Sequence, residues 1–309
     1  MRWRSRLNRE LKPLFSFRTY LNDLTTLGVG GPAECLARPL TQRDMEILLA
    51  FCREEGTPFW LLGGGSNVLV PDEGLPGITI LTSGLNGVFW EETGDAVTVY
   101  SESGTLLASL LGLSLRRGWT GLEFAAGIPG TLGGALAGNA GAEGLSLGDL
   151  VRSVKVIQDD GNVRDRSRGE IDFSYRFSSL GLEGVAITGC RLVLKKSNPS
   201  EIAEKVRGFL SNRKGQPRGV KTAGCIFKNP EGSSAGKLLD EAGCKGLECG
   251  NAVVSMKHAN FIENRGSAST KDILSLIDRC RTRVVQNSGV YLATEIRFLG
   301  NSLNAKIPN

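Results

Sequence analysis

The chain has 309 residues, of which 40% are hydrophobic and 22% are charged. This balance is typical of a globular protein and argues against a disordered chain, and the length allows two or three domains. We find no membrane-spanning apolar run and no secretory signal. The net charge of +5 comes partly from a basic N-terminal head. We interpret this head as a solvated terminus, because only Trp3 and Phe15 lie near it as stacking partners for a nucleic acid.

Seven cysteines are scattered along the chain without a Cys-x-x-Cys pair. Their odd number and their spacing predict free thiols in a reducing cytoplasm, and they argue against a disulfide framework or a zinc site. His258 is the only histidine, which excludes a metal site built from several histidines. We therefore expect no metal.

The first half of the chain alternates between helical and strand-like patterns. Residues 41–55 carry apolar side chains at helical spacing, and residues 106–116 form a second predicted helix that ends at Gly118. Short apolar or alternating segments predict strands at 58–62, 77–81 and 96–101.

Two glycine-rich runs interrupt these elements, one at 62–68 and one at 125–134 that continues to Gly141. A glycine inside a helix or strand costs roughly 0.5–1 kcal/mol relative to alanine, so such runs indicate a backbone that approaches something closely. Exposed amide groups in such a backbone can bind a diphosphate. The first run does not complete the Gly-x-Gly-x-x-Gly pattern of a Rossmann fold. Together the runs predict one cleft for an anionic cofactor.

The second half begins with a predicted hairpin, in which strand 151–158 and strand 163–165 flank a turn at 159–162. A composition change near residue 197 marks a domain boundary. After it we expect a helix at 201–213 with Ser200 as its N-cap. Further expected elements are a strand at 184–196, helices at 237–242 and 270–285, the latter capped by Ser269 or Thr270, and a strand at 290–299.

Six segments in this order resemble the UDP-N-acetylenolpyruvoylglucosamine reductase family, also called UDP-N-acetylmuramate dehydrogenases. The resemblance covers about residues 20–300, and its most specific part is the Ala-Gly-Ile-Pro-Gly-Thr-Leu-Gly-Gly motif with Asn-Ala-Gly downstream. The matching segments are 27–33, 62–69, 126–141, 175–176, 224–230 and 295–297.

The resemblance implies an α+β fold with two FAD-binding subdomains of the vanillyl-alcohol-oxidase type and a C-terminal α+β substrate-binding domain. On this basis we expect an N-terminal extension at 1–20, an FAD-binding domain at 21–196 and a C-terminal domain at 197–309. The two subdomains would meet near residues 82 and 83. The short turn after Arg176 resembles the shorter, second subtype of the family.

The resemblance also assigns cofactor residues. Those expected to bind FAD are Gly63, Gly64, Gly65, Ser66, Asn67, Gly127, Ile128, Pro129, Gly130, Thr131, Gly133 and, more weakly, Arg297. Relatives of this fold that oxidise alcohols often attach flavin to a histidine or cysteine in a glycine-rich loop. Neither run contains such a residue, so we expect FAD to be non-covalent.

The implied reaction reduces UDP-N-acetylglucosamine enolpyruvate to UDP-N-acetylmuramate, a peptidoglycan precursor, with NADPH as hydride donor. Arg176 and Glu295 match the residues that stabilise the enolate, and Cys225 matches the proton donor. Many members carry serine at this position. A thiol with an ordinary pKa near 8.5 is largely protonated at neutral pH, so cysteine preserves the role.

Tyr175 and Asn229 match substrate-binding positions, and Arg213 and Lys214 are candidates for the diphosphate of the nucleotide sugar. For His258 we favour a structural role. We expect a cytoplasmic monomer that acts in cell-wall biogenesis, and thereby in cell shape and division, without nucleic-acid or membrane partners. The alternatives are another FAD oxidoreductase of this fold that acts on an alcohol or hydroxy acid, and a non-catalytic flavin- or nucleotide-binding protein.

Overall fold

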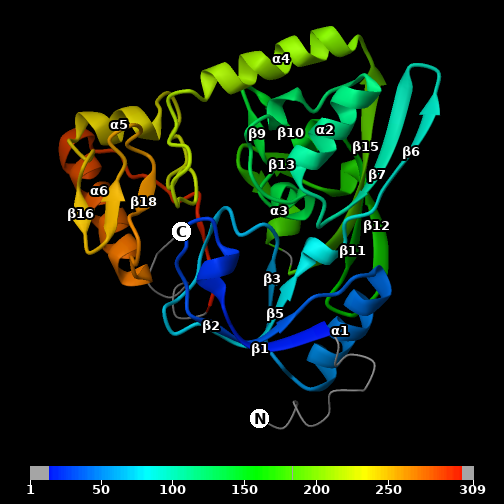
Figure 1. Cartoon of the computed structure of the whole chain (residues 1–309), viewed down its shortest axis with the longest axis horizontal. Coiled ribbons are helices and arrows are strands. Elements are labelled where there is room, and N and C mark those ends of the chain that lie inside the picture. Colours follow the sequence, from blue (N-terminus) through cyan, green and yellow to red (C-terminus); the bar gives the residue numbers. More distant parts are fainter. Residues whose placement is uncertain (1–13, 183, 301–309) are drawn as a thin grey trace. The chain divides into compact units, whose positions relative to one another are not determined.

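A computed structural model describes residues 14–182 and 184–300 (Figure 1). The basic N-terminal head lies outside these residues. Contacts divide the chain into two units. The first unit comprises the chain up to Phe15, with Ala37–Gly64 and Ile80–Arg213, and the second comprises Ser16–Leu36, Gly65–Thr79 and the chain from Lys214 onward. The predicted division into domains near residues 82 and 197 stays a prediction.

A six-stranded antiparallel sheet is the centre of the first unit. Its long middle strand β15 pairs with β11 on one side and β7 on the other, and the short strand β8 also pairs with β15. The strands are β6 (Val88–Thr93), β7 (Ala96–Glu102), β8 (Trp119–Thr120), β11 (Val151–Ile157), β12 (Val163–Ser167) and β15 (Ala186–Lys196). The hairpin predicted for residues 151–165 is confirmed as β11 and β12.

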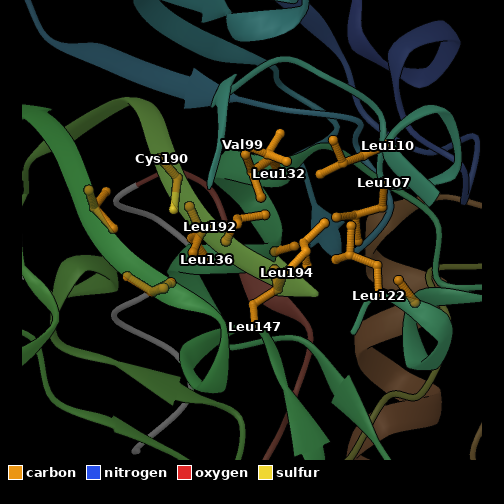
Figure 2. Packing of buried hydrophobic residues seen from close by; sticks show 14 of the residues in the cluster. Val99, Leu107, Leu110, Leu122, Leu132, Leu136, Leu147, Cys190, Leu192 and Leu194 are labelled. Atoms are coloured by element: carbon orange, nitrogen blue, oxygen red, sulfur yellow. The ribbon is translucent and has the colours of Figure 1, made fainter. Parts of the chain in front are cut away.

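A leucine-rich core packs against this sheet. Its helices are α2 (Leu107–Arg117) and α3 (Leu132–Ala137), and α4 (Pro199–Asn212) adds partly buried side chains. Figure 2 shows side chains of this core, among them Leu132 and Leu136 of α3 with Leu192 and Leu194 of β15. Helix α1 (Gln42–Glu54) and strand β3 (Phe59–Leu62) also belong to this unit.

Helix ends follow local sequence signals. Thr41 and Asp44 form a capping box at the start of α1, because the Thr41 hydroxyl accepts from the Asp44 amide at 3.1 Å and the Asp44 carboxylate accepts from the Thr41 amide at 2.9 Å. Helix α2 ends at Gly118, with φ of 70°, as predicted. The predicted N-cap of α4 was wrong. Asn198 caps this helix through the Ser200 amide, since Pro199 already occupies its first turn.

The second unit packs short strands against two helices. Strand β4 (Val68–Leu69) pairs in parallel with β19 (Arg297–Phe298), which brings the end of the first glycine run to the end of the described chain. The other elements are β1 (Phe15–Tyr20), β2 (Pro32–Ala37), β5 (Leu75–Leu81), α5 (Ala235–Glu241), β16 (Glu248–Cys249), β17 (Ala252–Val254), β18 (Ile262–Asn264) and α6 (Thr270–Ser288). Ser269 is the N-cap of α6, one of the two predicted caps.

Two expectations differ from the structure. The strand predicted for residues 290–299 is regular only at β19, because Thr294 forms only an isolated β-bridge, with Phe227. The second glycine run contains a helix, α3, which begins where the Thr131 hydroxyl accepts from the Gly134 amide. The sequence analysis also missed β9 (Gly141–Ala142), β10 (Leu145–Ser146), β13 (Phe173–Ser174), β14 (Phe177–Ser178) and the 3-10 turns at Leu21–Leu24, Thr82–Gly84, Glu123–Ala125, Leu147–Asp149, Arg168–Glu170 and Ser179–Gly181.

Among the described residues, no helix combines the length and the apolar character needed to cross a bilayer.

Candidate active site

The two glycine runs meet within the first unit. A Cβ on Gly63 would lie 2.5 Å from the Thr131 hydroxyl oxygen, and a Cβ on Gly64 would lie 2.8 Å from the Gly130 Cα. Both distances are far below a normal carbon contact, so only glycine allows this approach. The structure thus brings together segments that are more than 60 residues apart, as the sequence analysis expected.

This junction carries unused hydrogen-bond donors. Outside the strand ladders of the described residues, the backbone amides of Gly63, Gly64, Gly130 and Thr131 donate to no backbone carbonyl. The buried hydroxyls of Ser103 and Thr105 likewise have no described partner, although the carbonyls of these two residues accept from the amides of Gly133 and Leu132. A cluster of amide and hydroxyl donors fits an anionic group such as the diphosphate of FAD.

The segment before this junction lies beside the end of α4. Gly127 has a φ of 75°, and a Cβ on it would lie 3.1 Å from the Arg213 Cδ. Arg213 is therefore next to the second glycine run, whereas Lys214 is an exposed residue of the second unit. Ile128 packs partly against the core, and Pro129 is exposed.

The rest of the first run belongs to the second unit. Gly65 has a φ of 62°, and a Cβ there would collide with the Leu24 carbonyl oxygen. Ser66 is half-buried. The Asn67 side-chain amide donates to the Glu295 carbonyl at 3.1 Å, and the Arg297 amide donates to the Asn67 carbonyl at 3.1 Å. Asn67 therefore anchors the backbone of two other predicted site residues, a contact that its motif did not reveal.

Cys225 and Glu295 lie on neighbouring segments of the second unit. The backbone of Cys225 forms an isolated antiparallel β-bridge with Phe261, and the Ile226 amide donates to the Asn260 carbonyl at 2.9 Å. On the other side, the Glu295 amide donates to the Ile226 carbonyl at 2.7 Å. The backbones of the proton-donor candidate and the catalytic-glutamate candidate are thus one residue apart across these hydrogen-bonded segments. We call the paired segments the Cys225–Glu295 ladder. Cys225 is half-buried.

Asn260 holds this ladder in place. Its side-chain oxygen accepts from the Phe227 amide at 2.9 Å, and its side-chain nitrogen donates to the Phe227 carbonyl at 2.8 Å. Asn260 is 2% exposed, so the two bonds replace water completely. The sequence analysis missed this residue. The only available signal was its place next to His258 in the Lys-His-Ala-Asn-Phe segment.

A cavity of about 520 Å³ opens beside the same ladder. Its wall combines α5 with the segment that precedes Asn260, and its charged or titratable side chains are Lys237, Asp240, Glu241, Lys245, Lys257 and His258. Asn229 accepts from the Ala235 amide at the start of α5, at 3.0 Å, and so lies next to this wall.

His258 has a defined hydrogen-bonding state in the cavity wall. Its Nδ1 accepts from the Asn260 amide at 3.2 Å, which leaves the neutral ring's proton on Nε2. Burial, and next the charge of Lys245, lower the pKa of His258. Lys245 itself pairs with Asp240 at 2.6 Å. His258 thus helps to hold Asn260, which bonds to the Phe227 backbone, and it also lines the cavity.

Arg176 lies in the first unit, in the two-residue turn between β13 and β14. Its backbone is left-handed, with φ of 53°, and its Nη1 donates to the Gly141 carbonyl at 3.0 Å. The ring of Tyr175 lies 5.5 Å from the guanidinium carbon. Arg176 is half-buried and Tyr175 is exposed. The chain then reaches β15 after one 3-10 turn, as expected for the shorter subtype.

A metal site is not evident. In the described ranges, no three His, Cys, Asp or Glu side chains are grouped to hold an ion.

Comparisons with known proteins identify similar chains. Residues 216–299 match the family model of the UDP-N-acetylenolpyruvoylglucosamine reductase C-terminal domain, and residues 33–167 match an FAD binding domain. A UDP-N-acetylenolpyruvoylglucosamine reductase from Heliobacterium modesticaldum is 41% identical over 280 residues, which are 90% of this chain and 88% of that protein. One from Moorella thermoacetica is 42% identical, with 92% of each chain covered.

A solved structure is also similar. The crystal structure of UDP-N-acetylenolpyruvylglucosamine reductase from Thermus caldophilus has a TM-score of 0.79 and 38% identity, and the match covers 91% of this chain and 98% of that chain. The expected α+β architecture with an FAD-binding fold is confirmed.

Proposed function

Since the chain belongs to the UDP-N-acetylenolpyruvoylglucosamine reductase family of FAD-dependent oxidoreductases, we propose that it reduces UDP-N-acetylglucosamine enolpyruvate to UDP-N-acetylmuramate with NADPH. The observation that carries this proposal is the ladder that holds Cys225 next to Glu295, with the Asn67 side chain bonded to the Glu295 backbone. This ladder supports the proposal because it brings the backbone of a thiol residue next to that of a carboxylate residue.

The glycine junction is the proposed binding place for the diphosphate of FAD. The amides of Gly63, Gly64, Gly130 and Thr131 would donate to its oxygens, and Gly65, Ser66, Asn67, Gly127, Ile128, Pro129, Gly133 and Arg297 would complete the site. When bound, FAD accepts a hydride from NADPH and supplies it to the terminal carbon of the enolpyruvyl alkene. Neither run contains histidine or cysteine, so the cofactor is non-covalent in this proposal.

The side chains handle the charge and the proton. As the alkene is reduced, negative charge develops on the adjacent carbon and its carboxylate. Arg176 binds that carboxylate with its planar guanidinium, and Glu295 orients the reacting group and assists the same charge redistribution. Cys225 then donates the proton of its thiol to the adjacent carbon, which completes the lactyl ether.

The cavity beside α5 is the proposed site for the diphosphate of the nucleotide sugar. Three lysines outnumber the two acids in its wall, and the Nε2 proton of His258 adds a neutral donor. Asn229 lies at the start of α5, Arg213 and Lys214 are further candidates for the same diphosphate, and Tyr175 would contact another part of the substrate. The activity belongs to peptidoglycan precursor synthesis, and we propose a cytoplasmic monomer.

Two half-reactions test the proposal. Cys225→Ala should leave NADPH reduction of FAD intact and lower the rate with the enolpyruvyl substrate by about a hundredfold or more, since positioned proton donors contribute about 10²–10⁴. Cys225→Ser should retain activity. Stopped-flow absorbance of the flavin measures both steps, and equal losses in both steps would overturn the assignment of Cys225 as the donor.

The same assay separates the alternatives. NADPH consumption that depends on the enolpyruvyl nucleotide supports the proposed reaction. Oxygen consumption with a simple alcohol or hydroxy acid would favour a different oxidoreductase, and bound flavin without turnover would favour a binding protein.

A further inference from the structure

The Gly138-Asn139-Ala140-Gly141 segment follows the second glycine run, and the reaction described above gives it no task. Asn139 is 5% exposed and has a left-handed backbone, with φ of 45°. Asparagine tolerates this conformation better than most residues with a side chain. A buried carboxamide here must find partners for both its oxygen and its nitrogen.

Both partners are backbone groups on other segments. The Asn139 side-chain oxygen accepts from the Gly148 amide at 2.9 Å, and its side-chain nitrogen donates to the Ser174 carbonyl at 2.9 Å. Ser174 is the last residue of β13, directly before the turn residues Tyr175 and Arg176. The carboxamide therefore joins a fixed loop to the turn that carries the catalytic arginine.

That turn needs external support. Arg176 occupies the second position of a two-residue hairpin turn with a positive φ, a place that glycine or asparagine usually fills. An arginine there is disfavoured by its Cβ. A second hydrogen bond links the turn to the same segment: Arg176 Nη1 donates to the carbonyl of Gly141, two residues after Asn139, at 3.0 Å. Two bonds thus link the Asn-Ala-Gly segment to both ends of the Ser174–Arg176 turn.

The loop on the other side of Asn139 is itself held firmly. The Gly148 carbonyl accepts from Arg168 Nε at 2.9 Å, and Arg168 lies over the Phe173 ring at 4.9 Å. A Cβ on Gly148 would lie 2.7 Å from Phe173 Cγ, so this position requires the close packing that glycine allows. Asn139 is consequently bonded to a rigid support rather than to a mobile loop.

We propose that Asn139 is a positioning residue for the reaction, which fixes the backbone of the Ser174–Arg176 turn so that the Arg176 guanidinium is set to receive the substrate carboxylate. This inference rests on the proposed function, and specifically on the role of Arg176 there. Asn139 itself touches neither the substrate nor the cofactor in this scheme.

The test uses Asn139→Gly in the full-length FAD-loaded enzyme. Glycine keeps the left-handed backbone available and removes the side chain, including the carboxamide that makes both bonds. We expect reduction of FAD by NADPH to stay within about twofold, and reduction of the enolpyruvyl substrate to slow about tenfold, equivalent to about 1.4 kcal/mol. Glu143→Gly is the matched control. Glu143 is also left-handed, with φ of 55°, but its side chain accepts from Asn212 instead, so both rates should stay near wild type.

A double variant separates positioning from general destabilisation. In the Arg176→Ala background, Asn139→Gly should slow the second half-reaction no further, because the residue acts through the arginine that is already gone. The inference would be overturned if the double variant slowed the second half-reaction by the product of the two single losses. A wild-type rate in Asn139→Gly would also overturn it. If Arg176→Ala itself leaves that half-reaction unchanged, the proposed role of Arg176 fails and the inference fails with it.

Asn139→Asp covers the case in which the glycine variant does not retain FAD. It keeps the oxygen that accepts from Gly148 and loses the donor to Ser174. The same selective loss in the second half-reaction is expected, and unchanged or equally reduced rates in both steps would contradict the proposal.

Discussion

In the first unit, Gly63–Gly64 and Gly130–Thr131 approach so closely that no Cβ fits between them. In the second unit, the side chain and the backbone carbonyl of Asn260 and the backbone amide of Glu295 hold the Cys225–Phe227 segment, in which Ile226 and Phe227 are buried and Cys225 is half-buried. The first region therefore depends on the absence of side chains, and the second depends on their identity. Adding an atom should damage the first region most, and removing atoms should damage the second.

Gly64→Ala should give the largest effect. Its Cβ would meet the Gly130 backbone at 2.8 Å, which cannot rotate away. We expect separation of the two runs at a cost of about 3 kcal/mol, or about a hundredfold in FAD affinity if the junction binds the diphosphate. The flavin content of the purified protein and a titration with FAD measure this. Wild-type FAD affinity would show that the close contact is not needed for the cofactor.

Asn260→Ala should come next. It leaves the buried amide and carbonyl of Phe227 without their partners, so we expect the free energy of unfolding to fall by about 2 kcal/mol. Urea denaturation measures the loss. Asn260→Asp keeps only the acceptor, so its free energy of unfolding should lie between those of the wild type and Asn260→Ala. The FAD junction of the first unit should be unaffected, so a parallel loss of FAD binding would contradict the separation of the two regions.

Gly208→Ala should have a smaller effect of opposite sign. Gly208 lies within α4, where a Cβ would meet nothing within 4 Å. Alanine should stabilise the helix by up to about 1 kcal/mol. A rise in the melting temperature with unchanged FAD affinity is the expected result. A fall would show that this glycine also has a packing role.

His258→Gln should give the smallest effect, visible only as a pH dependence. Because burial and Lys245 lower the pKa of His258 against an opposing contribution from Asp240, the unfolded chain takes up a proton near pH 6.5 that the folded chain accepts only at lower pH. Stability should therefore fall as the pH drops through this window. Glutamine does not titrate, so the melting temperature should fall less between about pH 7.5 and about pH 5.5. Equal falls would contradict this role of His258.

Local patterns in the sequence predicted the elements whose cause is local. Helix α1 has its capping box and apolar spacing, α2 ends at Gly118, and the β11–β12 hairpin surrounds a turn-forming segment. The predicted strand at the C-terminal end was wrong except at β19, because pairing with β4 determines where a strand is regular there. The cap of α4 was wrong by two residues, since a proline shifted the start of the helix.

Site residues divide in the same way. The motifs identified Cys225, Glu295 and Arg176 as candidates, and the glycine runs indicated an amide-rich junction. Asn260 gave no comparable signal, and the Asn-Ala-Gly motif identified Asn139 without its role, because Asn260 bonds to a backbone group 33 residues away and Asn139 donates to one 35 residues away. A hydrogen bond to a main-chain carbonyl places no demand on the identity of the residue that supplies the carbonyl.

The sequence by itself determined the family and the cofactor class and supplied the candidate residues for the reaction, since these follow from short motifs. Only the tertiary structure decided which glycines are required by contact, how Asn67 and Asn260 hold the Cys225–Glu295 ladder, and that the Arg176 turn is left-handed and supported by Asn139. The physical reason is that each of these features joins segments distant in the chain, so that it exists only after the intervening residues have folded.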